Sequence, residues 1–307
     1  MRADEPHPQV RAVLERMDRL GVPDFVDADV ERARERFESM GSVATYRADL
    51  AVDDRTVDGP AGDLSVRVYE PARPRATLVF FHGGGFVVGS VESHDALARA
   101  LADRVDVTVV SVDYRLAPEH PFPAAVRDAV TALEWTDDEA DGLGGRPLVV
   151  AGDSAGGTLA AVVSLLGRDG DAPSVAHQVL FYPATSQSED WTSVADDATG
   201  RFLSAAEMAW FGEQYLRDPL EGANPYAFPL NACDLSGLPP ASVLTAGFDP
   251  LRDEGVAYAD RLAAADVPVT HRNYPAMVHG FVSMLGVVDA AETAIDDVAD
   301  DLASPLS

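Results

Sequence analysis

The sequence predicts an α/β fold in which a mostly parallel sheet of about eight strands carries helices on both faces. Short apolar runs alternate with helical stretches from about residue 46 onward, a pattern typical of such sheets. Most of these runs are continuously apolar, as expected of strands buried on both faces. The chain has 307 residues, enough for one large domain with an attached segment.

Seven strands are expected from the apolar runs. Residues 64–69 alternate like a half-exposed strand, and residues 269–274 are polar enough to lie at a sheet edge. The other five strands are expected at 77–81, 107–112, 148–151, 179–182 and 242–246. Helices are expected at 94–103, 124–135, 155–166, 251–264 and 289–302.

Two segments do not follow this alternation. In residues 1–45, apolar residues recur every three or four positions and glycines follow, which predicts two amphipathic helices. Residues 185–218 begin acidic, become aromatic and follow a strand, so they are interpreted as an insertion. Because amphipathic helices must bury their apolar faces, we expect 1–45 to form a helical cap segment. Residues 46–307 then form the main domain, with a cap insertion at about 185–218.

The charge balance is strongly acidic. There are 51 Asp and Glu residues against 23 basic residues, all of them Arg, for a net charge of −28. The absence of Lys excludes a Walker A loop, Schiff-base chemistry and Ser–Lys hydrolases. Nucleic acid is not an expected partner, because the negative field repels polyanions. The acidity predicts adaptation to high salt, whereas a GC-rich genome is an alternative explanation for the use of Arg alone.

Further classes are excluded by what the sequence lacks. Cys233 is the single cysteine, so no internal disulfide or Cys-rich metal site can form. The start of the chain shows no apolar signal-peptide region, and no run approaches the ~20 residues that cross a bilayer. We therefore expect a cytoplasmic protein without membrane insertion. The scattered His residues predict no metal site, and a homodimer is left open.

The first chemical motif is Gly152-Asp153-Ser154-Ala155-Gly156-Gly157, between an apolar run and a helical stretch. A G-x-S-x-G sequence in that setting is typical of a nucleophile elbow, in which small residues allow a sharp turn to expose the Ser hydroxyl. The start of the following helix faces a developing oxyanion. A glycine-rich turn with an incidental serine is the alternative.

The second motif is His82-Gly83-Gly84-Gly85-Phe86, directly after the run 77–81. Consecutive glycines let backbone N–H groups turn toward one point, as an oxyanion hole requires. A dinucleotide-binding loop is excluded because its third glycine would stand at Val88. The expected donors are Gly83, Gly84 and Ala155, and His82 is expected to brace the loop.

A base must activate the Ser154 hydroxyl, since a neutral hydroxyl is a poor nucleophile. Only His177, His271 and His279 follow it in the chain. His177 precedes a core strand and His271 lies within one, whereas His279 lies in a loop after the last expected strand. Ligands of α/β sheets bind at such carboxyl-end loops, so His279 is the predicted base.

The acid that orients the base is predicted to be Asp249. It follows the run 242–246, and Pro250 then begins a helix. Asp253 is the alternative, but it lies one turn into that helix, where solvent exposure is expected. Separate substitutions of the two residues distinguish them.

With these motifs, the sequence resembles the hormone-sensitive-lipase-like branch of the α/β-hydrolases, the bacterial family IV esterases. The matching stretches are 82–86, 113–124, 152–157, 249–253 and 279–281. The resemblance implies that 113–124, with Asp113, Tyr114 and Glu119, supports the oxyanion loop. It also implies an α/β-hydrolase fold with a helical cap.

The predicted function is carboxylic-ester hydrolysis through an acyl-enzyme, without a cofactor. The catalytic residues are Ser154, His279 and Asp249. By analogy with the family, a small-molecule ester with a short to medium acyl chain is the expected substrate. An amidase or peptidase is the first alternative, and a non-catalytic receptor, which tends to lose the triad His, is the second. The apolar residues expected to bind substrate are Phe86, Phe202, Met208, Trp210 and Phe211.

Overall fold

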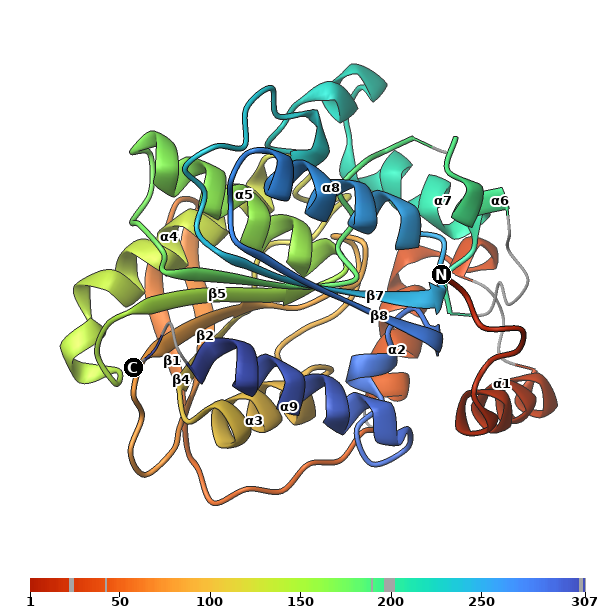
Figure 1. Ribbon diagram of the computed structural model, residues 1–307, viewed down its shortest axis with the longest axis horizontal. Coiled ribbons are helices and arrows are strands. Elements are labelled where there is room, and N and C mark those ends of the chain that lie inside the picture. Colours follow the sequence, from red (N-terminus) through yellow and green to blue (C-terminus); the bar gives the residue numbers. More distant parts are fainter. Residues whose placement is uncertain (22–24, 42, 189, 196–201, 304–305, 307) are drawn as a thin grey trace.

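The computed structural model describes residues 1–21, 25–41, 43–188, 190–195, 202–303 and 306. Its centre is an eight-stranded sheet in the order β1-β2-β4-β3-β5-β6-β7-β8 (Figure 1). The pairs β1–β2 and β2–β4 are antiparallel, and all other neighbouring strands are parallel. The predicted fold class, a mostly parallel eight-stranded sheet with helices on both faces, is confirmed.

The strands agree closely with the expected apolar runs. β6 begins two residues earlier than expected, so His177 is its first residue, and β8 extends four residues further, so His279 follows it directly. The strands are β1 (Ala51–Gly59), β2 (Gly62–Glu70), β3 (Thr77–Phe81), β4 (Thr108–Val112), β5 (Leu148–Asp153), β6 (His177–Phe181), β7 (Ala241–Phe248) and β8 (Val269–Val278).

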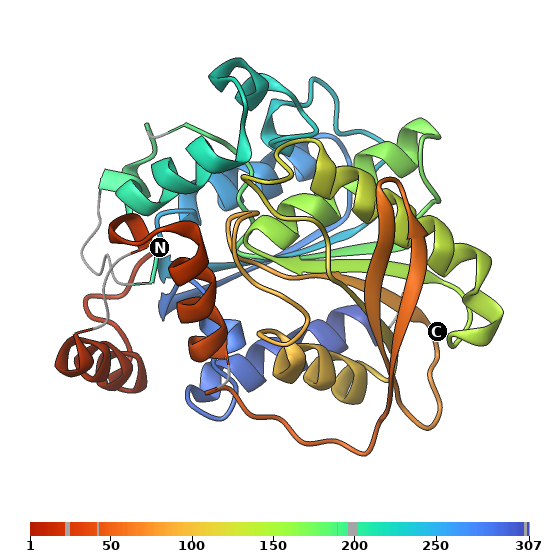
Figure 2. The same ribbon diagram turned by 180° about the vertical axis from the view of Figure 1, so that it is seen from behind.

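β1 was not expected from the sequence. It is an edge strand with mostly exposed residues, and only Val57 is buried, so its polar sequence lacks the apolar alternation that marks a half-buried strand. Residues 60 and 61 connect β1 to β2, and the two strands form a ribbon that turns away from the direction of the central strands (Figure 2). At the opposite edge of the sheet lies β8, as its polar sequence predicts.

Helices cover both faces of the sheet (Figure 1). One face carries α4, α5 and α8, and the other carries α3 and α9, which also pack against each other. Each face has its own apolar core. The helices are α1 (Pro8–Leu20), α2 (Val30–Gly41), α3 (Asp95–Val105), α4 (Ala124–Asp138), α5 (Ala155–Asp169), α6 (Thr192–Ala195), α7 (Ala205–Tyr215), α8 (Arg252–Ala264) and α9 (Asp289–Ala303). The 3-10 turns are Phe25–Asp27, Ala140–Gly142, Pro219–Ala223, Pro229–Asn231 and Phe281–Ser283.

The strand order brings two distant loops together. After β3 the chain crosses through α3 to β4, and then returns through α4 to β5, on the other side of β3. The loops that follow β3 and β5 therefore leave neighbouring strands at a topological switch point, where α/β sheets bind ligands. These loops are the glycine-rich loop and the predicted nucleophile elbow.

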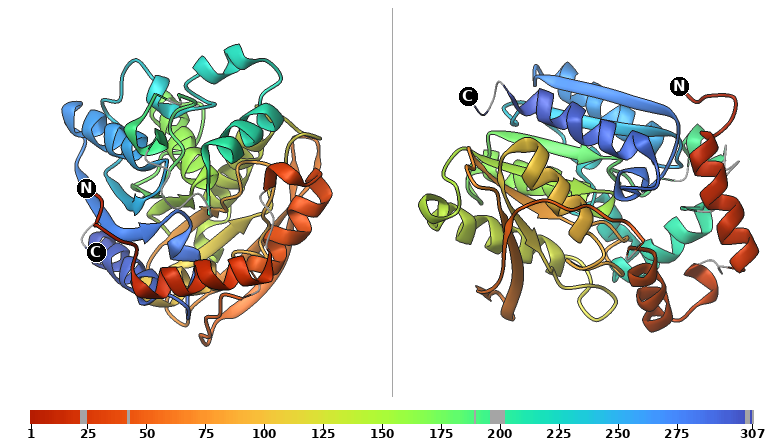
Figure 3. Two further views of the ribbon diagram at one scale, coloured as in Figure 1. Left: turned by 90° about the vertical axis from the view of Figure 1, so that its right-hand side faces the viewer. Right: turned by 90° about the horizontal axis from the view of Figure 1, so that it is seen from below.

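The two segments predicted to form a cap lie at the carboxyl ends of the strands. α1 and α2 lie at the same end of the molecule as α7 (Figure 3). The buried Glu207 of α7 accepts a hydrogen bond from the backbone N–H of Phe25, at 3.0 Å, and Phe25 packs on Phe211 with ring centroids 5.8 Å apart. The two segments are thus in direct contact, although the division into cap and main domain stays a prediction.

Candidate active site

Ser154 stands at a sharp turn between β5 and α5. Its backbone has φ 53° and ψ −118°, a conformation rarely adopted by residues other than glycine. A Cβ at Gly152 would lie 2.2 Å from the Gly156 backbone, and one at Gly156 would lie 1.9 Å from the carbonyl oxygen of Phe81. The glycines are therefore required by close backbone contacts, as the elbow motif predicts.

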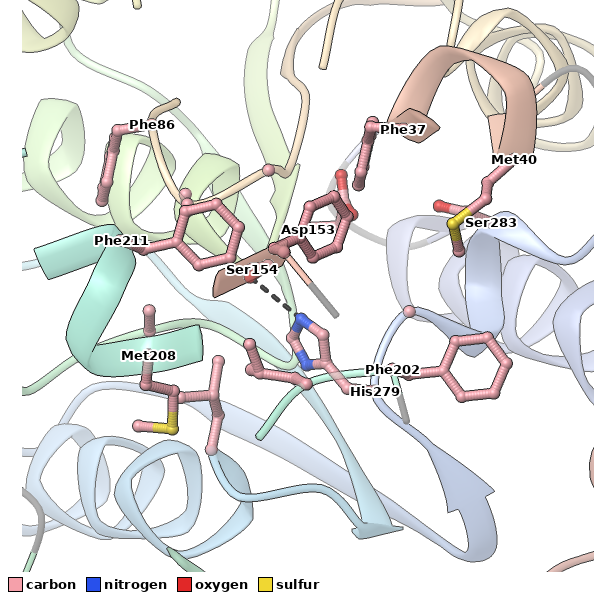
Figure 4. Close-up of a pocket in the computed structure, with 18 of the residues that line it drawn as sticks. Phe37, Met40, Phe86, Asp153, Ser154, Phe202, Met208, Phe211, His279 and Ser283 are labelled. Atoms are coloured by element: carbon pink, nitrogen blue, oxygen red, sulfur yellow. Dashed lines mark hydrogen bonds between the residues drawn. The ribbon is translucent and has the colours of Figure 1, made fainter. Parts of the chain in front are cut away.

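Three side chains from the ends of three strands meet at this turn. The Ser154 Oγ lies 3.0 Å from Nε2 of His279, and Nδ1 of His279 lies 2.9 Å from Oδ2 of Asp249 (Figure 4). Ser154 and Asp249 are buried, and the His279 side chain is 12% exposed. The ring of Tyr182 meets the imidazole edge-on, with centroids 4.8 Å apart. The arrangement suits proton transfer from the hydroxyl to an imidazole that a carboxylate orients.

The two candidate acids face different partners. Besides His279, Asp249 accepts a hydrogen bond at Oδ1 from the Leu251 N–H, at 2.8 Å. Asp253 instead pairs with Nε of Arg252, at 2.8 Å, and accepts a hydrogen bond from the N–H of Ser193, also at 2.8 Å. Asp249 is therefore the carboxylate in contact with the imidazole.

The other two candidate bases have partners away from Ser154. His177, at the amino end of β6, lies 2.9 Å from Oγ of Ser242, and burial lowers its pKa to about 4. His271, on β8, lies 2.9 Å from Oγ1 of Thr245. Of the three histidines considered from the sequence, His279 alone contacts Ser154.

The oxyanion loop, residues 82–86, adopts unusual backbone conformations. Gly84, Gly85 and Phe86 have φ values of 125°, 58° and 63°, so three consecutive residues lie in the region that favours glycine. The hydroxyl of Tyr114 donates to the carbonyl oxygen of His82, at 2.7 Å, and the N–H of Ala117 donates to that of Phe86, at 2.8 Å. The stretch 113–124 thus contacts both ends of the loop.

One predicted oxyanion donor is wrong. The N–H of Gly83 donates to Oδ1 of Asp153, at 2.8 Å, and is therefore not directed at a substrate. A Cβ at Gly83 would lie 2.5 Å from the other oxygen of that carboxylate. Gly84 and Ala155 line the cavity, and within the described residues no acceptor takes their N–H groups.

His82 is the first residue of the oxyanion loop. It is fully buried, stacks on Tyr114 with ring centroids 4.3 Å apart, and donates through Nδ1 to the carbonyl oxygen of Gly83, at 2.8 Å. Burial lowers its pKa to about 3, so the ring is neutral at pH 7. These contacts agree with a bracing role for His82.

A cavity of about 960 Å³ opens above Ser154 and His279. The oxyanion loop, α1, α2, α7 and residues 279–287 all contribute to its lining. It extends on both sides of the hydroxyl. Phe86, Met208 and Phe211 lie on one side, and Phe37, Met40 and Phe202 lie on the other (Figure 4).

Four of the five predicted pocket residues line this cavity: Phe86, Phe202, Met208 and Phe211. The prediction for Trp210 is wrong, because this residue is not among those that line it. Met208 and Phe211 are three positions apart and share one face of α7, whereas Trp210 is two positions from Met208 and lies on another face. Trp210 packs edge-on against Phe211, with centroids 5.1 Å apart.

Two residues beside the site received no role from the sequence. Asp153 holds Gly83, and Nε2 of the buried His94 lies 3.3 Å from Oδ1 of Asp153. Asp153 could have been noticed as a charged residue next to the nucleophile. His94 precedes a helix and has no spacing signal, so only the fold shows its position. Within the described residues, no group of three His, Cys, Asp or Glu side chains is placed to hold a metal ion.

Similar proteins are known for most of the chain. A family model described as alpha/beta hydrolase fold matches residues 78–283. The esterase LipI of Mycobacterium tuberculosis is 41% identical over 88% of this chain and 86% of its own length, and carboxylesterase NlhH of the same species is 43% identical over 88% of each chain. The solved structure of ester-hydrolase EH1AB1, from the metagenome of Lake Arreo, superposes with a TM-score of 0.92 at 41% identity, and covers 97% of this chain and 98% of its own.

Proposed function

Because the chain belongs to the α/β-hydrolase family, in its hormone-sensitive-lipase-like branch, we propose that it hydrolyses carboxylic esters through Ser154, His279 and Asp249. One observation supports the assignment of the reaction to these three residues. It is the continuous pair of contacts from the Ser154 hydroxyl to the His279 imidazole, 3.0 Å, and on to the Asp249 carboxylate, 2.9 Å.

The first step is attack of the Ser154 Oγ on the ester carbonyl carbon. His279 accepts the hydroxyl proton at Nε2, while its Nδ1–H donates to Asp249. Asp249 holds the tautomer in which Nε2 is free to accept, and it stabilises the imidazolium that forms. The Leu251 N–H bond to the other carboxylate oxygen fixes the orientation of Asp249.

The carbonyl oxygen becomes an oxyanion in the tetrahedral intermediate. The N–H groups of Gly84 and Ala155 are the donors proposed to stabilise it, and α5 directs the positive end of its dipole toward the same point. The imidazolium then protonates the departing alkoxide, and the alcohol leaves. Water then attacks the acyl-enzyme by the same steps. His279 takes the proton of the water, the carboxylic acid is released, and the serine hydroxyl is restored.

The substrate range is proposed to be esters with short to medium acyl chains. Support comes from Phe211, whose ring lies on one side of the cavity. Atoms of that ring would lie 2.3 Å from a Cβ at Gly85, so the ring rests on the oxyanion loop. Its neighbour Phe86 is held by Tyr215, with stacked rings 3.8 Å apart. An acyl chain that enters on this side therefore meets a wall of packed aromatic rings.

The experiment that tests the function is a panel of p-nitrophenyl esters of increasing acyl length, together with matched p-nitroanilides. We expect the esters to be hydrolysed, with the highest kcat/KM at short to medium acyl chains, and a fluorophosphonate probe to label Ser154. Faster turnover of the anilides would identify an amidase. Absence of both labelling and turnover would identify a non-catalytic receptor.

In the same panel, Phe211→Ala is expected to shift the preference toward longer acyl chains. Removal of the ring opens the wall, so the ratio of kcat/KM for decanoate to that for butyrate should rise by about ten-fold or more. Gln214→Ala is the control, because Gln214 lies on the same helix but does not line the cavity. An unchanged ratio in Phe211→Ala would show that the acyl chain binds elsewhere.

We further propose that the protein is adapted to high salt. The net charge of −28 includes exposed like charges such as Asp58 and Asp63, which lie opposite each other in the pairing of β1 with β2. Salt screens the repulsion between such charges. We expect the thermal midpoint to be higher in 2 M KCl than in dilute buffer, by about 5 °C or more. A higher midpoint in dilute buffer would contradict the proposal.

A further inference from the structure

A buried pair of one histidine and one aspartate lies directly behind the oxyanion loop and takes no part in the triad. Asp153 is 4% exposed and immediately precedes Ser154, and His94 is 2% exposed at the start of α3. Oδ1 of Asp153 accepts the N–H of Gly83, at 2.8 Å, and lies 3.3 Å from Nε2 of His94. Both residues also line the cavity above Ser154, and Figure 4 shows Asp153 beside the nucleophile.

The hydrogen bonds around His94 indicate which of its nitrogens carry protons. The hydroxyl of Ser93 donates to the carbonyl oxygen of Ser90, at 3.0 Å, so its lone pairs are left for other donors. Nδ1 of His94 lies 3.0 Å from this hydroxyl oxygen, so it is placed to donate to it when the hydroxyl proton is directed at the Ser90 carbonyl. Nε2 faces a carboxylate, which only accepts, so it also carries a proton. These two contacts suit an imidazole protonated at both nitrogens, which is a cation.

The titratable rings near the pair are neutral. His82, 5.5 Å from His94 between ring centroids, is neutral because burial lowers its pKa to about 3. Burial also keeps Tyr114 and Tyr182 neutral by raising each pKa well above the usual value. From α2, Phe37 presents an aromatic ring to His94, and Glu38 accepts a hydrogen bond from Ser90. Burial alone would raise the pKa of Asp153, but its contacts, with His94 foremost, lower it.

A buried carboxylate next to the nucleophile has two opposite effects on ester hydrolysis. It fixes the oxyanion loop through Gly83, which positions the neighbouring N–H groups. Its negative charge, however, opposes the negative charge that forms on the substrate oxygen, and in a buried site this repulsion is weakly screened. A nearby cation removes the second effect and leaves the first.

We propose that His94 is a positioning residue which, as an imidazolium, holds and neutralises Asp153, so that Asp153 can fix the oxyanion loop without opposing the oxyanion. This inference rests on the proposed function, because an oxyanion forms only if the protein cleaves an ester. It also assigns Asp153 a role in positioning Gly83.

The test is a double-mutant cycle with His94→Gln, Asp153→Asn and the double variant, measured on p-nitrophenyl butyrate. His94→Gln removes the cation and leaves the carboxylate, so kcat should fall by about 10- to 100-fold with little change in KM. A fall of this size is equal to or smaller than the fall caused by loss of one oxyanion donor. Asp153→Asn should cost less, since its amide oxygen still accepts the Gly83 N–H. The double variant should recover most of the kcat lost in His94→Gln, because the uncompensated charge is gone.

His177→Gln is the matched control. It makes the same change in a buried imidazole, but at the amino end of β6, where the partner is Ser242. Its kcat should stay near that of the wild type, and thermal midpoints should report the folding of every variant. If His94→Gln does not fold, the double variant and Asp153→Asn still decide, since they should have nearly equal kcat.

Three outcomes overturn the proposal. They are a wild-type kcat in folded His94→Gln, a double variant whose loss equals the product of the two single losses, and a double variant more than about ten-fold slower than Asp153→Asn. A wild-type protein that labels with fluorophosphonate and hydrolyses the ester keeps the proposed function whatever the cycle gives. A wild-type protein that does neither removes the proposed function, and this inference with it.

Discussion

Ser154→Ala is expected to lower kcat for p-nitrophenyl butyrate on the order of 10⁶-fold. The substitution removes the only atom that can form the acyl-enzyme, while the cavity, the imidazole and the oxyanion donors stay in place. Alanine fits the turn as well as serine does, because both carry a Cβ at the φ of 53°. The variant should therefore fold, bind substrate and fail at the first chemical step.

The control for this prediction is Ser283→Ala, which removes a hydroxyl from the lining of the same cavity. Its kcat should change by no more than a few-fold, because Ser283 contacts neither His279 nor Asp249 through any hydrogen bond found in the structure. Steady-state rates, with the concentration of active sites titrated by a fluorophosphonate, give both values. Substantial turnover by purified Ser154→Ala would refute the nucleophile assignment.

Asp249→Asn is expected to lower kcat by about 10⁴-fold. The Leu251 N–H donates to Oδ1 of Asp249, so the amide oxygen of the asparagine would keep that position. Its NH₂ group would then face Nδ1 of His279, which must lose its proton to accept this hydrogen bond. The proton moves to Nε2, and an imidazole protonated there cannot take the proton of Ser154.

Asp253→Asn separates this effect from a general loss of negative charge near the site. Asp253 contacts Arg252 and Ser193, so its substitution should affect local stability and leave kcat close to the wild-type value. Rates measured from pH 6 to 9 make the comparison independent of the choice of a single pH. If Asp253→Asn lost as much activity as Asp249→Asn, the assignment of the acid would be wrong.

Most of the fold could be predicted because parallel strands that are buried on both faces consist of continuous apolar residues. Residues 77–81 are all apolar except Thr77, and all five are fully buried in β3. β1 could not be found in this way, since eight of its nine residues are not buried and its pairing with β2 depends on a short turn. The expected fold class and carboxylic-ester hydrolase function are both confirmed by the comparisons.

The catalytic residues of the candidate site could be predicted from the sequence, whereas residues whose roles depend on tertiary contacts could not. Ser154 lies in a motif whose glycines are required sterically, and the order of acid and base along the chain left few candidates. The predictions of Gly83 as an oxyanion donor and of Trp210 as a pocket residue are wrong, because both depend on tertiary contacts that the sequence does not show. An Asp153 oxygen takes the N–H of Gly83, and helix geometry turns Trp210 out of the cavity lining. His94 is 59 residues from Asp153 in the chain, and only the fold brings the two side chains together.

The position of Gly156 has a wider consequence. Any side chain at this residue would collide with the end of β3, where the oxyanion loop begins, since even a methyl carbon would stand 1.9 Å from the Phe81 oxygen. A bulkier residue would force the two loops apart and lengthen the gap between nucleophile and amide donors, yet every polar group would survive. The distance between the nucleophile and the amide donors thus depends on the absence of a side chain at Gly156. A comparison of functional groups alone would not reveal this requirement.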